Sequence, residues 1–357
     1  MTTTYLNDKL VLSVQLIPAP VVATGLGPMV VVSAEGSSDG VPGGDQTVAD
    51  ADAADALFAD NLITEAARDQ LVSAFSQDYT PSTVYVATYN PSATPAETAS
   101  DALSVMEDAG VDFQVVVPAV QTDAVLTDVG EWLGTGTRRW RYLVVAESRN
   151  ADLITADKPA ALSDCEVTTF RMLYGDEDEG LAGGFAGKVQ GRGLTDGPVG
   201  AELRILGVDL PGLTGAQQGH AKANDVGVLY ALDTGAGATE RVIRGVTTYS
   251  GESFTASVSL LYAIRRLVQS SKELLQRKSI TGDALLATAA GEVELQGALV
   301  GPLTDLAAQG HLVPGDELPQ GYAVSVEAVG DQLQAAVTLR LGQEVETITL
   351  GVTGEVV

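Results

Sequence analysis

Runs of hydrophobic residues alternate between strand-like and helix-like patterns in the first half of the chain. Residues 83–89, 111–117 and 140–146 are rich in β-branched and aromatic residues, which favour strands. Between them, residues 94–109 and 122–133 place apolar side chains at helical spacing, and a glycine follows each segment. Strands that alternate with helices in this way predict a small, mainly parallel sheet with flanking helices.

The second half of the chain changes pattern several times. Residues 180–193 are rich in glycine but lack the Gly-Lys-Ser/Thr ending of a phosphate-binding loop, so they predict a flexible or irregular connection. Residues 253–278 form the longest uninterrupted helical pattern, and residues 299–309 predict a further helix that ends at Gly310. Alternating apolar and polar positions then predict three strands, at 322–329, 334–341 and 344–352.

A strand-like segment also lies near the N-terminus. Residues 9–17 are apolar with polar residues at alternate positions, and Pro18 and Pro20 end the pattern. Residues 28–33 predict a second short strand, and residues 34–46, rich in Gly, Ser, Asp and Pro, mark a boundary before the α/β region. The first 35 residues therefore have the pattern of an edge strand or an arm.

The composition narrows the possible classes of protein. The 357 residues include 47 Asp and Glu against 20 Lys and Arg, and the resulting formal charge of -27 argues against nucleic-acid binding. A hydrophobic content of 45% indicates a folded chain rather than a disordered acidic one. The single cysteine, Cys165, excludes a disulfide framework and a Cys-based metal site. Without a secretory leader pattern or a long apolar run, we expect a soluble protein made inside the cell.

The charge is unevenly distributed along the chain. Residues 241–278 carry seven cations against two carboxylates, a segment charge of +5, whereas the segments on either side are acidic. A basic segment between acidic ones predicts an electrostatic docking surface for an acidic partner. Lysine is scarce, with six residues against fourteen arginines, and together with the acidic excess this raises the hypothesis of a salt-rich host.

Side chains with obvious catalytic or metal-binding patterns are scarce. The two histidines, His220 and His311, have no second His or Cys at ligand spacing, so we expect exposed or locally hydrogen-bonded histidines. Residues 176–179 are acidic but lack the spacing of a calcium loop, and no Gly-x-Ser-x-Gly nucleophile elbow occurs. We therefore assign no catalytic, cofactor-binding or metal-ligating residues, and we expect no enzyme activity and no cofactor.

A succession of short motifs in the C-terminal half points to a known family. It runs from Asp-Gly-Pro-Val-Gly at 196–200 and Ala-Asn-Asp-Val-Gly-Val-Leu-Tyr at 223–230 to Gly-Val-Thr-Thr at 245–248 and a long helix with Arg265 and Arg266. In this order, and with a last helix followed by terminal strands, the chain resembles the contractile tail sheath proteins of phages and phage-like particles. The resemblance covers roughly residues 9–352.

The resemblance implies a particular architecture. The expected fold class is α+β/α/β multidomain, with small mixed sheets, flanking helices and a sheath-like core domain that carries extended N- and C-terminal strand arms. The expected parts are residues 1–35, an N-terminal arm and strand joining the core; residues 47–200, an outer α/β domain; and residues 201–357, the C-terminal core domain with its terminal arm.

The resemblance also implies partners and contact residues. In this family the arms complete a neighbour's sheet by strand addition, and a helix docks on a rigid inner tube. The expected partners are further copies of this chain, an inner tail tube protein, and baseplate and tail terminator proteins, without nucleic acid or membrane insertion. The expected contact residues are Arg265, Arg266, Lys272, Arg277 and Lys278 on the tube-docking or intersubunit helix, and Leu10, Val11, Leu12, Val14, Leu16, Val345, Ile348 and Leu350 on the arms.

The implied function is a tail sheath subunit that polymerises helically around the tube and contracts to drive it through a target-cell envelope. Such a subunit would be found in a virion tail or particle sheath and assembled in a bacterial or archaeal cytoplasm. Two alternatives remain open. One is a tube or baseplate protein of the same kind of particle, and the other is an α/β small-molecule-binding enzyme built on the sheet of residues 47–148.

Overall fold

The computed structural model describes most of the chain from Pro28 to Leu341. The described residues are 28–35, 46–81, 83–134, 141–147, 168–173, 180–194, 198, 203–207, 214–216, 227–233, 239–244, 254–281, 283, 285–330 and 332–341.

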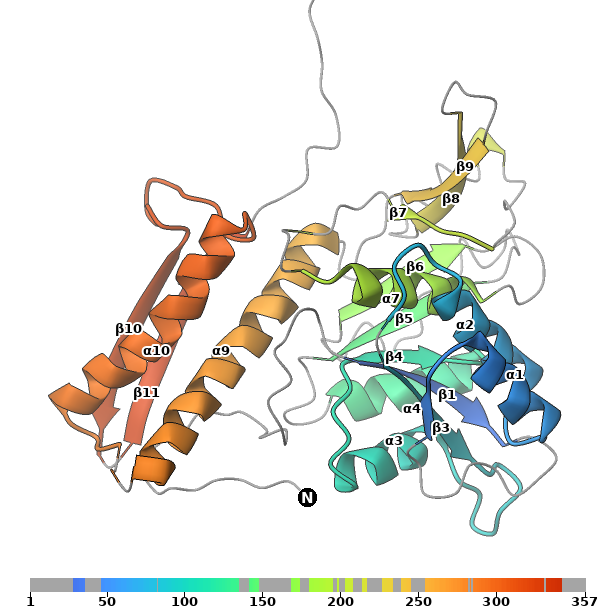
Figure 1. The fold of residues 1–357 in the computed structure, drawn as a ribbon, viewed down its shortest axis with the longest axis horizontal. Coiled ribbons are helices and arrows are strands. Elements are labelled where there is room, and N and C mark those ends of the chain that lie inside the picture. Colours follow the sequence, from blue (N-terminus) through green and yellow to red (C-terminus); the bar gives the residue numbers. More distant parts are fainter. Residues whose placement is uncertain are drawn as a thin grey trace, which may run out of the picture.

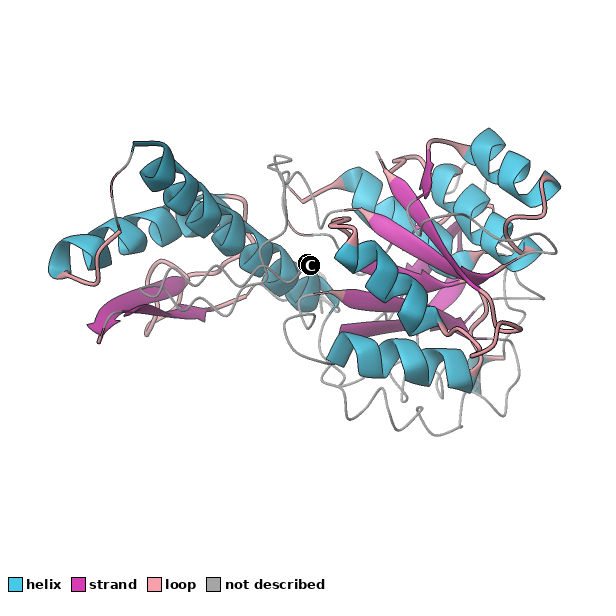
Figure 2. Ribbon diagram, turned by 90° about the horizontal axis from the view of Figure 1, so that it is seen from below, coloured by secondary structure: helices cyan, strands magenta, loops and turns pink. Residues whose placement is uncertain are grey.

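A nine-stranded sheet forms the centre of the first part of the protein, in the order β2-β3-β1-β4-β5-β6-β8-β9-β7 (Figures 1 and 2). Six neighbouring strands run parallel: β3 (Val84–Tyr89), β1 (Met29–Ala34), β4 (Val115–Pro118), β5 (Tyr142–Glu147), β6 (Thr168–Leu173) and β8 (Gly227–Asp233). Antiparallel strands flank them, with β2 (Gln46–Val48) at one edge and β9 (Thr239–Arg244) and β7 (Leu203–Arg204) at the other.

This sheet confirms the mainly parallel α/β prediction but is larger than the small sheets expected from the sequence. The short strand expected at 28–33 is β1, which lies inside the sheet, and β8 and β9 extend it. The α/β part therefore continues to Arg244, beyond the boundary at residue 200 that the sequence suggested.

Helices cover both faces of the sheet (Figure 2). Met29 and Val31 of β1 pack towards α1 (Ala51–Ala59), α2 (Glu65–Phe75) and α7 (Leu181–Arg192), whereas Val30 and Val32 pack towards α3 (Ala99–Asp108) and α4 (Asp123–Gly134). Because successive residues of a strand point to opposite faces, a strand covered on both sides needs an uninterrupted apolar run. The sequence Met-Val-Val-Val of β1 meets this requirement.

The starts of the helices follow their capping residues. Thr64 caps α2, because its side-chain hydroxyl accepts a hydrogen bond from the backbone amide of Ala67. Helix α3 begins at Ala99 rather than near residue 94, because Thr98 and Asp101 form a reciprocal capping box.

The glycine-rich segment at 180–193 is a helix, so the prediction of a flexible or irregular connection was wrong. Helix α7 lies with its backbone directly against α2. A Cβ atom added at Gly183 would stand 2.1 Å from the carbonyl oxygen of Gln70, and one at Gly187 would stand 2.6 Å from that of Ala74. The Gln70 Oε1 atom also accepts a hydrogen bond from the backbone of Gly183 at 2.6 Å. The glycines therefore permit close helix packing.

The second part of the protein consists of two long helices and a hairpin (Figure 1). The helices are α9 (Phe254–Thr281), as predicted, and α10 (Ala289–Ala308), which begins about ten residues before the predicted start because Thr288 caps it. Strand β10 (Tyr322–Val329) pairs antiparallel with β11 (Gln332–Leu339), and the third predicted strand, 344–352, lies outside the described residues.

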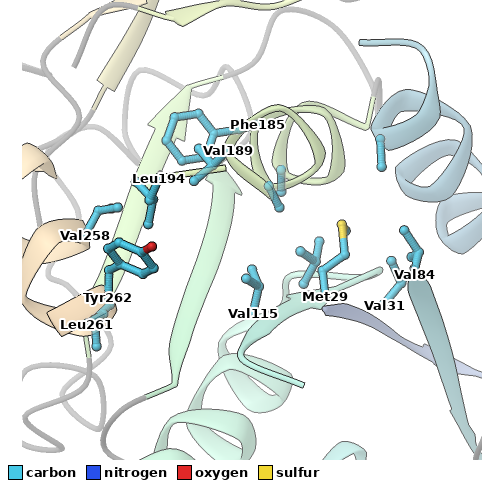
Figure 3. Packing of buried hydrophobic residues seen from close by; sticks show 14 of the residues in the cluster. Met29, Val31, Val84, Val115, Phe185, Val189, Leu194, Val258, Leu261 and Tyr262 are labelled. Carbon is cyan, nitrogen blue, oxygen red and sulfur yellow. The ribbon is translucent and has the colours of Figure 1, made fainter. Parts of the chain in front are cut away.

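Helix α9 is buried in two hydrophobic cores. Its first half places Phe254, Val258 and Tyr262 in the core that also contains Phe185 of α7 and the sheet residues around Met29 (Figure 3). Its second half contributes Leu274 to a smaller core with residues of α10 and β11. At 1.5 Å per residue the helix is about 42 Å long, so it joins the two parts as a rigid rod.

We predict that Gly187→Ala destabilises the protein. The added methyl group would stand 2.7 Å from the Cα atom of Ala74, so α2 and α7 must separate. Overpacking of this kind costs about 1–3 kcal/mol. Gly297→Ala is the matched control, because nothing lies within 4 Å of a Cβ atom at that position of α10. The control gains up to about 1 kcal/mol in helix propensity. Urea unfolding followed by circular dichroism measures the free energy of unfolding of the two variants. Equal stabilities of the two variants would contradict the packing argument.

Candidate functional site: the C-terminal helices and hairpin

The arm residues expected from the sequence lie outside the described residues. The described chain begins at Pro28, directly before β1, and its last described residue, Leu341, comes two residues after the end of β11. The N-terminal segment therefore joins the α/β sheet, and the C-terminal segment continues from the hairpin. The residues concerned are Leu10, Val11, Leu12, Val14, Leu16, Val345, Ile348 and Leu350.

The hairpin has one covered face and one exposed face. Val324 and Val326 of β10 and Leu333 and Val337 of β11 pack against the smaller core beneath α9 and α10. Ser325 and its neighbours on the opposite face are exposed. A two-stranded sheet is marginally stable by itself, and its strand edges can accept further strands.

Arg265 joins α9 to the α/β part. Its guanidinium donates to Asp112 Oδ2 at 2.9 Å and to Gln114 Oε1 at 3.3 Å, and both acceptors lie just before β4. The Arg265 side chain is only 11% exposed. Burial lowers the pKa of Lys272, further along α9, to about 8, although the nearby Asp112 carboxylate acts in the opposite direction.

Two more of the five basic residues bind α10. Arg266 pairs with Asp305 at 3.4 Å, and Lys278 pairs with Glu294 at 2.8 Å. Arg277 is exposed and has no ion-pair partner among the described residues. Three of the five basic residues of α9 are thus paired within the subunit, and Arg277, near the end of the helix, is exposed.

The same end of the C-terminal part exposes large apolar side chains. Ile280 in the last turn of α9 is 86% exposed, and Val293 near the start of α10 is 68% exposed. Leu286, between the two helices, is also exposed. Exposed apolar groups that lie together, rimmed by charge, are typical of protein–protein contact surfaces.

His311 joins three segments and was not expected to be buried. Its Nε2 atom lies 2.8 Å from the Leu194 carbonyl oxygen, and its Nδ1 atom lies 3.0 Å from the Ser259 hydroxyl. Because a carbonyl only accepts, Nε2 carries the proton and Nδ1 accepts from Ser259. The ring centroid is 5.2 Å from that of Tyr262. Burial lowers the pKa of His311, and the charge of Arg192 lowers it further, whereas the bond to the carbonyl raises it.

The residues that hold the two parts together had little signal in the sequence. Asp112 is one of many carboxylates, and His311 follows a glycine, where an exposed histidine is the ordinary expectation. Only the contact with α9 in the folded protein distinguishes Asp112 from the other carboxylates and His311 from an exposed histidine. An alignment that showed Asp112 varying together with Arg265 would have been the usable signal.

The described residues show no metal cluster: none of their His, Cys, Asp and Glu side chains gather in groups of three or more that could hold an ion. No helix in the described ranges combines the length and apolarity needed to cross a membrane. Cys165, His220 and the acidic residues 176–179 lie outside the described residues.

Comparison with known proteins identifies the fold. No known family profile matches the sequence, and no curated protein matches it either. Among solved structures, a chain of the anti-feeding prophage (AFP) baseplate is 17% identical, covers 95% of this chain and 96% of its own, and has a TM-score of 0.66. The contracted sheath of the PVC extracellular contractile injection system is 14% identical, covers 97% and 96%, and has a TM-score of 0.61. A sheath tail protein from Listeria innocua is 10% identical, covers 91% and 96%, and has a TM-score of 0.56.

These likenesses show that the chain has a contractile tail sheath-like fold. The three matching structures are components of sheaths or a baseplate, and none is described as an enzyme. The coverage extends over nearly the whole chain, including the C-terminal helices and hairpin.

We predict that acid weakens the protein partly through His311. Its folded-state pKa lies below the ordinary value of 6.5, so the unfolded chain binds a proton more readily. Stability is therefore retained above about pH 6.5 and declines as the pH falls towards the folded-state pKa. In His311→Gln the amide can replace both hydrogen bonds without titrating. The advantage in melting temperature of the original protein over this variant should shrink between pH 7.5 and pH 5, and a constant difference would contradict the prediction.

Proposed function

We propose that this chain is a sheath subunit of a contractile particle. It polymerises helically around an inner tube and contracts to drive the tube through a target-cell envelope. The observation that carries the proposal is the sheath-like fold, which extends over 97% of the chain in the match to the contracted PVC sheath. On this proposal the protein is located in a particle sheath that is assembled in the host cytoplasm.

The mechanism that fits this fold is mechanical. Each subunit packs in two helical lattices, an extended one and a more stable contracted one, and the gain in interface energy drives the change. The continuous core from the sheet to α9 supports movement of the subunit as a rigid body, because close-packed interiors deform little. The arms then act as the hinges between subunits.

Strand exchange is the proposed connection between subunits. Residues 9–17 and 344–352 have the alternating pattern of strands, and the β10–β11 hairpin is a two-stranded sheet that added strands would extend. Strand addition provides many backbone hydrogen bonds, so such a connection can persist while the subunits rotate.

The tube-docking surface is proposed at the end of α9. Arg265, Arg266 and Lys278 are engaged within the subunit, whereas Arg277 and the exposed Ile280 are available to a partner. A tube surface that carries carboxylates around an apolar patch would fit this end of the helix. Baseplate and terminator proteins are the proposed partners at the two ends of the polymer.

A baseplate component is the second candidate. The AFP baseplate chain has a TM-score of 0.66, against 0.61 for the contracted PVC sheath. A baseplate subunit would form closed rings or remain a monomer, whereas a sheath subunit forms long polymers.

We expect the expressed protein to form striated hollow tubes with a wide lumen in electron micrographs. Deletion of residues 1–17 should give a folded monomer that does not polymerise, because it removes the proposed donor strand. Circular dichroism and the sedimentation coefficient check the folding and the oligomeric state of the variant. Narrow smooth tubes would indicate a tube protein, closed rings a baseplate protein, and normal tubes from the truncated chain would contradict the role of the N-terminal arm.

Arg277→Glu should weaken binding of the sheath subunit to its tube protein without changing the melting temperature. Arg265→Glu, on the same helix, is the matched comparison and should destabilise the fold, because it places a carboxylate against Asp112. Loss of such a buried charged partner costs about 1–3 kcal/mol. Co-sedimentation with the tube protein and thermal unfolding separate the two effects. Unchanged sedimentation of Arg277→Glu would exclude this end of α9 as the docking surface.

A further inference from the structure

The turn of residues 313–321, which precedes the hairpin, is tied at both ends to one residue. The Arg340 carbonyl accepts a hydrogen bond from the Val313 amide at 2.9 Å, and the Arg340 amide donates to the Gly321 carbonyl at 2.8 Å. Backbone bonds of this kind fix the shape of a loop without using side chains. The turn therefore forms a platform of defined shape beside Arg340.

The side chain of Arg340 lies across this turn at Gly315. A Cβ atom added at Gly315 would stand 2.5 Å from Arg340 Cζ and closer still to Nη1, so the guanidinium occupies the space that a side chain at this position would fill. The Gly315 amide donates to the Leu318 carbonyl at 2.9 Å, which closes the turn. A long side chain that already rests in a fixed cradle loses less entropy when it binds a partner.

The charge of Arg340 is not neutralised within the subunit. Arg340 is exposed and forms no ion pair with the described residues, although Asp316 and Glu317 lie in the turn itself. It is the only Lys or Arg after Lys278, whereas the same stretch contains 11 Asp and Glu. The exposed Val313 lies beside it. An exposed arginine next to an apolar side chain is typical of protein–protein contact surfaces.

The α/β part presents the complementary charge. Residues 46–134 contain 15 Asp and Glu but a single cation, Arg68. Arg68 is already paired with Asp55 and Asp69 on the same part. Exposed carboxylates that form no ion pair with described residues remain there, among them Asp52, Asp123 and Glu131. Opposite charges can therefore guide the C-terminal part of one copy to the α/β part of another.

We propose that Arg340, held on the turn of residues 313–321, binds a carboxylate within residues 46–134 of a second copy of the chain. The contact joins two different surfaces, so it can repeat from copy to copy, as an open polymer requires. A guanidinium of fixed orientation can bind a carboxylate through two parallel hydrogen bonds. This inference rests on the proposed assembly role and specifies one contact within it.

Carbodiimide cross-linking of the assembled full-length protein tests the contact, because this reagent joins a lysine amine to a carboxylate that it touches. Arg340→Lys places such an amine on the turn. Two batches of this variant, one isotopically labelled, are assembled together, and mass spectrometry distinguishes cross-links between copies from those within one copy. Lys278 and Glu294, 2.8 Å apart in one subunit, provide the positive control. Arg340→Gln, which carries no amine that reacts, is the matched negative control.

We expect a cross-link between residue 340 and an Asp or Glu of residues 46–134 in the other copy, and none from residue 340 in Arg340→Gln. Cross-links confined to one copy, as with Asp316 or Glu317, would overturn the inference while the sheath proposal stands. Cross-links to carboxylates elsewhere in the second copy, or none in polymers that do form, would overturn it equally. Failure of the original chain to form polymers would overturn both proposals.

The contribution of the charge is measured without a cross-linker. Arg340→Gln should raise the protein concentration needed for polymerisation about fivefold, as expected for an ion pair with well-defined geometry. Gly297→Glu, at an open position of α10, changes the net charge by the same amount and should leave that concentration within about twofold. Sedimentation at a series of concentrations measures both variants. Equal effects would show that only the net charge matters and would overturn the role of Arg340.

The cradle has its own test. Gly315→Ala should weaken polymerisation in the same direction as Arg340→Gln, because the added methyl group displaces the guanidinium from the turn. The melting temperature should change little, since the displaced group is the exposed end of a flexible side chain. Gly301→Ala is the matched control, because nothing lies within 4 Å of a Cβ atom at that position. Normal polymerisation of Gly315→Ala would show that the turn does not position Arg340.

Discussion

The burial of one helix in two cores is the constraint on which the rest of this structure depends. Helix α9 gives Phe254, Val258 and Tyr262 to the core of the α/β sheet, and Leu274 to the core beneath the hairpin. A continuous helix of about 42 Å transmits orientation without bending much. The position of the hairpin relative to the sheet is therefore set by how the first half of α9 is seated.

Polar contacts fix the orientation of α9 where apolar burial alone would let the helix rotate. Apolar packing is not directional, so it would tolerate small rotations of α9 about its axis. The bonds from Arg265 to Asp112 and from Ser259 to His311 have defined geometry and join α9 to two other segments, and His311 is in turn bonded to Leu194. Together with the pairs that Arg266 and Lys278 form with α10, they engage three of the five basic residues of α9 within the subunit.

The hairpin is the least complete element of the described structure. Its inner face is covered, and Gln296 and Glu292 of α10 bond to backbone groups on the outer edge of β10. Exposed strand edges invite association between copies. A net charge of -27 opposes indiscriminate contact of that kind.

The sequence by itself determined the α/β alternation, most helices and strands of the described chain, and the order of motifs that resembles contractile sheath proteins, because these depend on local periodicity and capping. It did not reveal that residues 181–192 form a helix, since glycine has low helix propensity and only the contact with Gln70 and Ala74 makes it necessary. It also did not reveal the partners of Arg265 or the burial of His311. Those depend on contacts between residues more than 100 positions apart, as with His311 and Leu194, which no local pattern encodes and only the tertiary structure decides.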